Sequence, residues 1–189
     1  MSFNVRLFSK ERASLHRGNR LLRYDVENTA HGIELRRYTR YDYAAINVTG
    51  AQSEALERGF AALRDYVNAG NADEDQLQMS LPLSQILIGH HRGCEEGREW
   101  RVASPIEGRG GRLSAPEDPS ITIHTSRSER LAVLTLAGAD IADPVAAQPK
   151  LDLALQKFGL HADGALRLLL HDDPATPVDL RLTELAVPV

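Results

Sequence analysis

A stretch of 19 residues occurs twice in this chain, and this repeat limits the possible folds more than any other feature of the sequence. The copies are Ile33–Ala51 and Ile121–Ala139, which align without a gap at an offset of 88 residues and both end in Gly-Ala. Each copy reads as a strand, a short polar turn, a second strand and a closing glycine, which predicts a hairpin. Any two hairpins resemble each other to some degree, but the shared register and ending favour a true repeat. Two copies are too few for a solenoid, so they predict one domain made of two pseudo-symmetric halves.

Composition and charge exclude several classes of protein. The chain has 189 residues with 42% apolar content, which is enough for one domain with a hydrophobic core. Its net charge of −4 argues against nucleic acid as a partner. Cys94 is the single cysteine, so an internal disulfide is impossible. No apolar run has the length of a signal peptide or a membrane span, and we therefore expect a protein of the reducing cytoplasm.

The remaining patterns divide the chain into an N-terminal arm, 1–20, and a single domain, 21–189. The halves of this domain are expected at about 33–90 and 121–189. A stretch rich in glycine, proline and charge, 90–120, predicts a long connecting loop with one strand at 99–103. Alternation of apolar and polar residues predicts the other strands at 21–27, 33–38, 43–48, 77–82, 84–89, 121–126, 130–137, 165–170 and 180–187.

Two segments have the spacing of amphipathic helices. In Ser53–Ala69 one apolar stripe is expected to face the sheet, with Ser53 as the N-cap; the stripe consists of Leu56, Phe60, Leu63 and Val67. Small residues beside this stripe, including Gly59, either let the helix lie close to the sheet or leave room for a ligand. The second helix is expected at Pro149–Phe158 and ends at a glycine. Each half is thus a ββαββ unit, which predicts an α+β fold with a distorted antiparallel β-barrel and two helices.

Several motifs of the first half occur together in one known family. The run IELRRY is followed by a helix containing GF..LRDYV, then by GN, and then by QMSLPL. These motifs resemble those of the SOUL family of haem-binding proteins, and the resemblance covers about 22–189. The matching residues are Glu34, Arg36, Tyr38, Gly59, Phe60, Leu63, Tyr66, Asn71, Met79 and Pro82.

The resemblance implies both a fold and a function. The family's fold is a duplicated, distorted barrel with two helices, similar to that of gyrase-inhibitor-like effector-binding domains. The implied function is the binding of haem or another tetrapyrrole by a non-enzymatic carrier or buffer. The implied partner is thus a small hydrophobic or amphiphilic ligand. Arg37 stands where some members carry a histidine proposed as axial ligand, and Arg58 lies near the helix positions thought to meet the haem propionates, which here are Glu57 and Ala62.

Candidate haem contacts follow from the chemistry of haem, which needs an apolar slot and often an axial side chain. The expected slot is the helix face formed by Leu56, Phe60 and Leu63, together with Met79; the alternative is that this face is simply core. Histidine is a frequent ligand of haem and metals. The candidate histidines are His31, His91 and His171. The run around His91 and Cys94 matches no known spacing of zinc ligands, so the sequence does not decide whether a metal binds.

Glu184 is the most informative acidic residue, because it lies between apolar residues on the last predicted strand. In a buried slot it could bind a cationic ligand or act as a general base. This interpretation gives an alternative function, a gyrase-inhibitor-like module that binds or hydrolyses a small molecule. The other interpretation of Glu184 is structural, as the partner of Arg36 or Arg181. A third possibility is an interaction domain with a filled core and no pocket.

Overall fold

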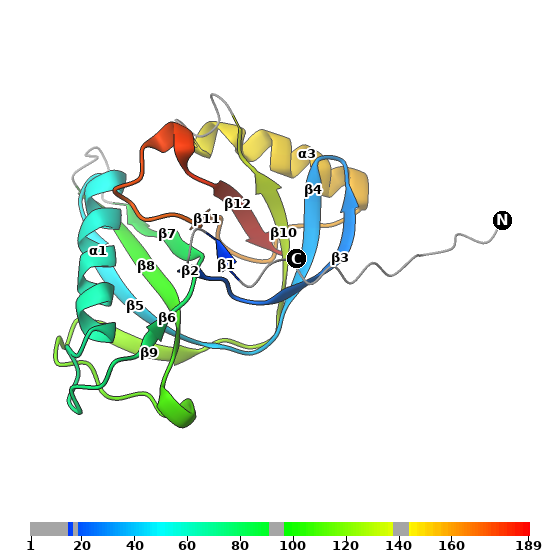
Figure 1. The fold of residues 1–189 in the computed structure, drawn as a ribbon. Coiled ribbons are helices and arrows are strands. Elements are labelled where there is room, and N and C mark those ends of the chain that lie inside the picture. Colours follow the sequence, from blue (N-terminus) through cyan, green and yellow to red (C-terminus); the bar gives the residue numbers. More distant parts are fainter. Residues whose placement is uncertain (1–14, 17–18, 91–96, 138–143) are drawn as a thin grey trace.

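The computed structural model describes residues 15–16, 19–90, 97–137 and 144–189. The predicted ligand His91, the neighbouring Cys94 and the Gly-Ala ending of the second repeat copy lie outside these ranges. The described chain forms an α+β fold with a ten-stranded antiparallel sheet and two helices (Figure 1). None of its helices is long and apolar enough to cross a membrane.

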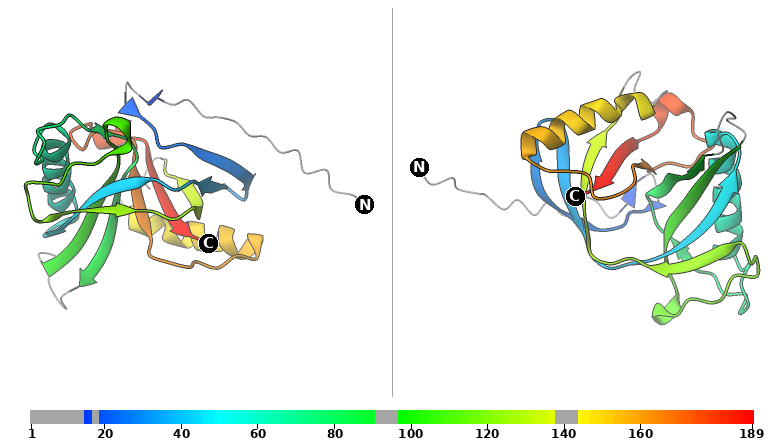
Figure 2. Two further views of the ribbon diagram at one scale, coloured as in Figure 1. Left: turned by 90° about the horizontal axis from the view of Figure 1, so that it is seen from below. Right: turned by 180° about the vertical axis from the view of Figure 1, so that it is seen from behind.

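The strands of the large sheet do not pair in chain order. Their spatial order is β3 (Tyr24–Ala30), β4 (Ile33–Tyr38), β10 (Glu129–Thr135), β12 (Thr183–Pro188), β11 (Arg167–Leu170), β7 (Leu83–His90), β8 (Arg98–Glu107), β5 (Asp42–Thr49) and β9 (Ile121–Thr125). β6 (Gln78–Met79) pairs with β8 outside this path, and β1 (Leu15–His16) pairs only with β2 (Asn19–Arg20). The described end strands β3 and β9 do not pair with each other. The sheet is therefore curved but open, and the predicted barrel is not confirmed (Figure 2).

The repeat copies pair with each other, so the prediction of two hairpins was wrong. β4 pairs with β10, and β5 pairs with β9, in one antiparallel register that places Tyr38 opposite Glu129 and Asp42 opposite Thr125. Between the two ladders lie the short non-strand segments 39–41 and 126–128, where Ser126 N donates to Tyr41 O at 2.8 Å. Alternation and polar turn residues predict strands, but they do not specify which strands become neighbours.

Alternation along the strands separates two faces of the sheet. α1 (Gln52–Val67) and α3 (Gln148–Phe158) both pack on one face and share one hydrophobic core with it. On β8, for example, Trp100 and Val102 belong to this core, whereas Arg101 and Ala103 point to the other face. Since the described helices cover only the first face, we call the second the helix-free face.

Helix α1 lies very close to the sheet. Its apolar stripe is confirmed, but the helix begins after Ala51, and no side chain caps it, so Ser53 is not the N-cap. A Cβ atom added at Gly59 would lie 2.7 Å from Val102 Cβ, closer than side chains approach. The small residues of this helix therefore serve close packing and leave no space for a ligand beside β8.

Two other sequence predictions need correction. The strand expected within the stretch 90–120 is longer than predicted, because β8 occupies ten residues of it and the predicted range 99–103 is only its centre. Pro105 within the strand and Gly108 just after it are typical of loops, so the sequence pattern does not indicate where this strand ends. The last strand begins at Thr183, because a 3-10 turn at Val178–Leu180 occupies the start of the predicted strand. The short 3-10 segments Arg109–Gly111 and Pro144–Ala147 complete the described elements.

Candidate functional site

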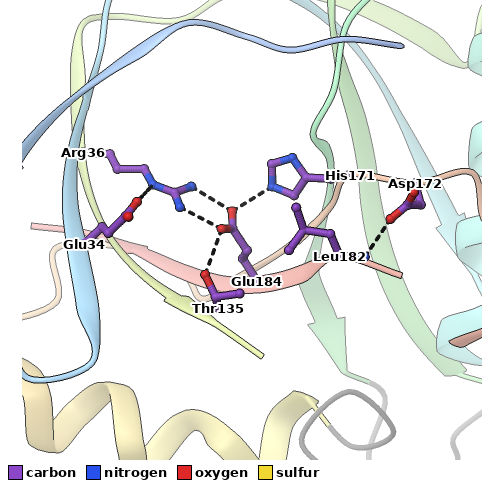
Figure 3. Close-up of polar contacts among 7 residues, drawn as sticks. All are labelled: Glu34, Arg36, Thr135, His171, Asp172, Leu182 and Glu184. Carbon is purple, nitrogen blue, oxygen red and sulfur yellow. Dashed lines mark hydrogen bonds and ion pairs between the residues drawn. The ribbon is translucent and has the colours of Figure 1, made fainter. Parts of the chain in front are cut away.

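A buried ion cluster lies on the helix-free face where β4 and β12 flank β10. Arg36 donates from both terminal nitrogens to the two carboxylate oxygens of Glu184, at 2.8 and 2.7 Å (Figure 3). Its Nε donates to Glu34 at 2.8 Å. Arg36 is 0% exposed and Glu184 is 2% exposed. The geometry is the two-pronged arrangement in which arginine binds a carboxylate most strongly.

Two further residues saturate the carboxylate of Glu184. His171 Nε2 lies 2.7 Å from Glu184 Oε2, and Thr135 Oγ1 donates to Oε1 at 3.2 Å (Figure 3). The ring of Tyr24 lies under the guanidinium of Arg36, with 4.4 Å from Cζ to the ring centroid. All of these contacts come from strand residues on the same face, apart from His171, which directly follows β11.

Electrostatics keep both members of the central pair charged. Burial by itself raises the pKa of Glu184, but the hydrogen bonds and charges of His171 and Arg36 outweigh it and hold that pKa well below its usual value. Burial likewise lowers the pKa of Arg36, and the bond to Glu184 outweighs it and raises that pKa. A carboxylate with such a low pKa is a poor general base. The contacts support the structural interpretation of Glu184 with Arg36 as partner, whereas Arg181 binds the backbone carbonyls of Pro174 and Thr176.

A hollow of about 380 Å³ opens on the same helix-free face. Its volume falls within the range of roughly 300–1,000 Å³ that is common for small-molecule sites. Glu184 and His171 are not among the described residues that line it. Its apolar and aromatic wall is formed by Leu22, Tyr38, Tyr41, Tyr43, Pro82, Ile86, Ala103, Pro105, Leu131 and Leu169. Its polar and charged residues are Ser84, Arg101, Ser104, Thr125, Ser126, Arg127, Glu129 and Arg167.

The charges of this hollow do not balance. Arg167 forms an ion pair with Glu129 at 2.8 Å, and Tyr41 Oη donates to the same carboxylate at 3.0 Å. Among the described residues, the side chain of Arg101 has one hydrogen bond, to Asn47 Oδ1 at 3.3 Å, and the exposed Arg127 has no ion-pair partner. After the pairing of Arg167 with Glu129, the hollow retains the positive charges of two arginines.

The predicted slot on α1 is filled by core packing. Leu56 is 4% exposed and Leu63 is 1% exposed, and both belong to the cluster shared by the two helices and the sheet. Phe60 and Met79 are half-buried against the same cluster. Of the two possibilities, slot or core, the observed contacts are those of core.

The other predicted contacts are scattered over the surface. Arg37 is exposed on β4 and pairs with Glu27. Arg58 is exposed and donates to the backbone carbonyl of Thr49. His31 lies in the turn after β3, with its ring 5.2 Å from the ring of Phe158. Apart from the four core residues at α1, the structure brings together Glu184 and His171 among the described members of the predicted set. Within the described ranges, no three His, Cys, Asp or Glu residues are grouped to hold a metal ion.

Sequence reasoning missed the residues that line the hollow. Arg101 falls on the strand predicted at 99–103, but its neighbours across the hollow depend on the order of the strands in the sheet. Tyr41 and Arg127 lie in the segments 39–41 and 126–128 between the two ladders, and their neighbours depend on the unexpected strand pairing. The alternation along each strand could have identified part of the lining. Residues that alternate with the core-facing ones, such as Tyr43 and Leu169, point to the helix-free face.

Comparison with solved structures identifies the fold class. The C-terminal domain of EcmrR superposes with a TM-score of 0.60 at 10% identity, over 82% of this chain and 95% of that chain. A hydrolase from Listeria innocua gives a TM-score of 0.59 at 10% identity, over 85% and 93% of the two chains. At such low identity these similarities establish the fold alone.

The sequence places the chain in one family within this fold class. The family model described as SOUL heme-binding protein matches residues 20–188, nearly the whole length. The chain therefore belongs to the SOUL family, as the motifs around Arg36 and Met79 indicated. No curated protein sequence is significantly similar to it.

Proposed function

We propose that this chain binds an acidic, planar amphiphile of the tetrapyrrole class, such as haem, in the hollow on its helix-free face. The observation that carries this proposal is the charge of the hollow. An aromatic and aliphatic wall faces Arg101 and Arg127, which have no ion-pair partner among the described residues. Membership of the SOUL family supports the ligand class. The role we propose is that of a non-enzymatic carrier or buffer.

The residues of the hollow suit the parts of a porphyrin. Tyrosine and leucine side chains provide flat apolar contact for the macrocycle. The guanidinium groups of Arg101 and Arg127 would hold its carboxylates, since arginine matches carboxylate geometry. Tyrosine is one of the side chains that bind haem iron. Among the lining tyrosines, Tyr38 is buried and Tyr41 is bonded to Glu129, so Tyr43 would be the one to hold the iron. A bound haem would supply a redox-active iron, and the protein's part would be to hold and shield it.

The alternative function, a cation-binding or hydrolytic module that uses Glu184, has less support. One solved structure of the same fold is named a hydrolase, which makes the idea reasonable at the level of fold. A cationic ligand would need a carboxylate with free oxygens. Glu184 is 2% exposed, and Arg36, His171 and Thr135 already occupy its oxygens.

Binding of haem and of metal-free protoporphyrin to purified protein tests the proposal. We expect saturable shifts of the porphyrin absorbance with the full chain. The double variant Arg101→Ala/Arg127→Ala should bind about tenfold more weakly. Each exposed ion pair contributes up to about 1 kcal/mol, so the loss of two is expected to cost about 1.4 kcal/mol, which corresponds to a tenfold change in affinity.

The matched control is Arg112→Ala, which removes an exposed arginine that does not line the hollow. This variant should bind both ligands as the natural chain does. Absence of binding by the natural chain would refute the proposed ligand class. Equal binding by the double variant and the Arg112 control would place the ligand elsewhere on the protein.

A further inference from the structure

A second hollow of about 530 Å³ adjoins the first. Leu22 and Tyr41 line both hollows, so their side chains form the boundary between them. Other residues of the second hollow are Arg20, Leu21, Arg23, Thr39, Arg40, Ser80 and Glu107. The same boundary residues also line a smaller hollow of about 230 Å³, which contains Asp42. The three depressions thus lie next to one another around Leu22 and Tyr41, and we refer to them together as the groove.

The boundary is held from both sides by hydrogen bonds. Leu22 N donates to Leu81 O at 2.6 Å, which ties the segment before β3 to the chain beside β6. Tyr41 is fixed through its phenol, which donates to Glu129 Oε1 at 3.0 Å, and through its backbone, which donates to Ser126 Oγ at 2.9 Å. Leu22 therefore provides an apolar surface and Tyr41 an aromatic one at the middle of the groove.

The second hollow repeats the charge imbalance of the first. Arg20 pairs with Glu107 at 2.7 Å, just as Arg167 pairs with Glu129 in the first hollow. Arg23 and Arg40 are exposed and have no ion-pair partner among the described residues.

Both larger hollows of the groove therefore carry positive charge without an ion-pair partner among the described residues, and an apolar and an aromatic side chain lie where they meet, on a protein whose net charge is −4. Asp42 partly offsets this charge, but its carboxylate already accepts a hydrogen bond from Thr125 at 2.6 Å.

We propose that the natural ligand spans both hollows and carries acidic groups on opposite edges, with Arg23 and Arg40 binding the edge that Arg101 and Arg127 do not reach. This inference rests on the proposed function. It narrows the ligand class to a tetrapyrrole with carboxylates around its rim, as opposed to one with carboxylates on a single edge. A ligand with one acidic edge can neutralise only one end of the groove, whereas a ligand acidic on all sides neutralises both.

The test compares two metal-free porphyrins that differ in the placement of their acids. Protoporphyrin IX has its carboxylates on one edge, and coproporphyrin has a carboxylate on every pyrrole ring. We expect the natural chain to bind coproporphyrin about tenfold more tightly than protoporphyrin IX, because two additional exposed ion contacts would contribute about 1.4 kcal/mol. The variant Arg23→Ala/Arg40→Ala should abolish this preference, and the advantage of coproporphyrin should shrink with added salt because exposed ion contacts are screened.

The possible results separate this inference from the proposed function. Arg112→Ala serves again as the control and should retain the preference. If protoporphyrin binds through Arg101 and Arg127 but coproporphyrin binds no more tightly, the second hollow is not used and only this inference fails. The same holds if the preference survives loss of Arg23 and Arg40. If neither porphyrin binds, the proposed function fails with it.

Discussion

Replacing Arg36 by methionine should lower the free energy of unfolding by about 3–5 kcal/mol, because the change leaves the buried carboxylate of Glu184 without its main counter-charge. Methionine retains much of the side-chain length, so the loss reflects charge more than packing. The contacts of His171 and Thr135 remain, but neither provides the two-pronged bond of a guanidinium. Denaturant unfolding followed by circular dichroism measures the change.

The matched control is Arg37→Met on the adjacent position of β4. Arg37 is exposed and pairs with Glu27 at the surface, so its loss should cost less than about 1 kcal/mol. The double variant Arg36→Met/Glu184→Leu should recover most of the stability lost in Arg36→Met, because an apolar pair can replace a buried ion pair without leaving an isolated charge. If the single losses simply add in the double variant, the two residues are not coupled and the ion pair does not account for the loss in Arg36→Met.

Truncation of the α1 core should have the second large effect. Leu63→Ala should lower the free energy of unfolding by about 2–5 kcal/mol, because the leucine is 1% exposed within the shared core and its removal leaves a cavity. Leu153→Ala on α3 is the control, since Leu153 is 53% exposed and should cost little. Thermal or denaturant unfolding of both variants provides the comparison.

This prediction distinguishes core from ligand slot on the face of α1. If the face served a ligand, Leu63→Ala would weaken porphyrin binding while leaving the free protein almost as stable. We expect the opposite, a large loss of stability and unchanged affinity at temperatures where the variant stays folded. A stability loss as small as that of Leu153→Ala would contradict the close packing of α1 on the sheet.

Local patterns in the sequence predicted most of the elements. The stripe through Leu56 and Leu63 identified α1, and Gly159, with its left-handed φ of 67°, ends α3 as expected. Strand pairing was not predictable in the same way. Each repeat copy has the alternation of apolar and polar residues expected of a hairpin, yet β4 and β5 each pair with a strand of the other copy. Alternation shows which side chains share a face of the sheet, but it does not specify which strands become neighbours.

The candidate site was harder to predict for the same reason. Arg36 and Glu184 are far apart in the chain and meet only because β4 and β12 flank β10. From the sequence, Glu184 could be either a ligand-binding or basic group or the structural partner of Arg36 or Arg181, and the contacts support the second role. The hollow was harder still to predict, because Tyr41 and Arg127 come from two non-strand segments and Arg101 from a strand, and their neighbours depend on the complete sheet order.

The central claim is that the ligand binds on the helix-free face and not beneath α1. Backbone amide spectra recorded by NMR during titration with metal-free protoporphyrin IX test this claim most directly. We expect the largest shifts at the amides that surround the hollow, including Tyr43, Arg101, Ala103 and Leu169, with little change at Leu56 and Leu63. Shifts concentrated along α1, with the hollow unaffected, would contradict the claim.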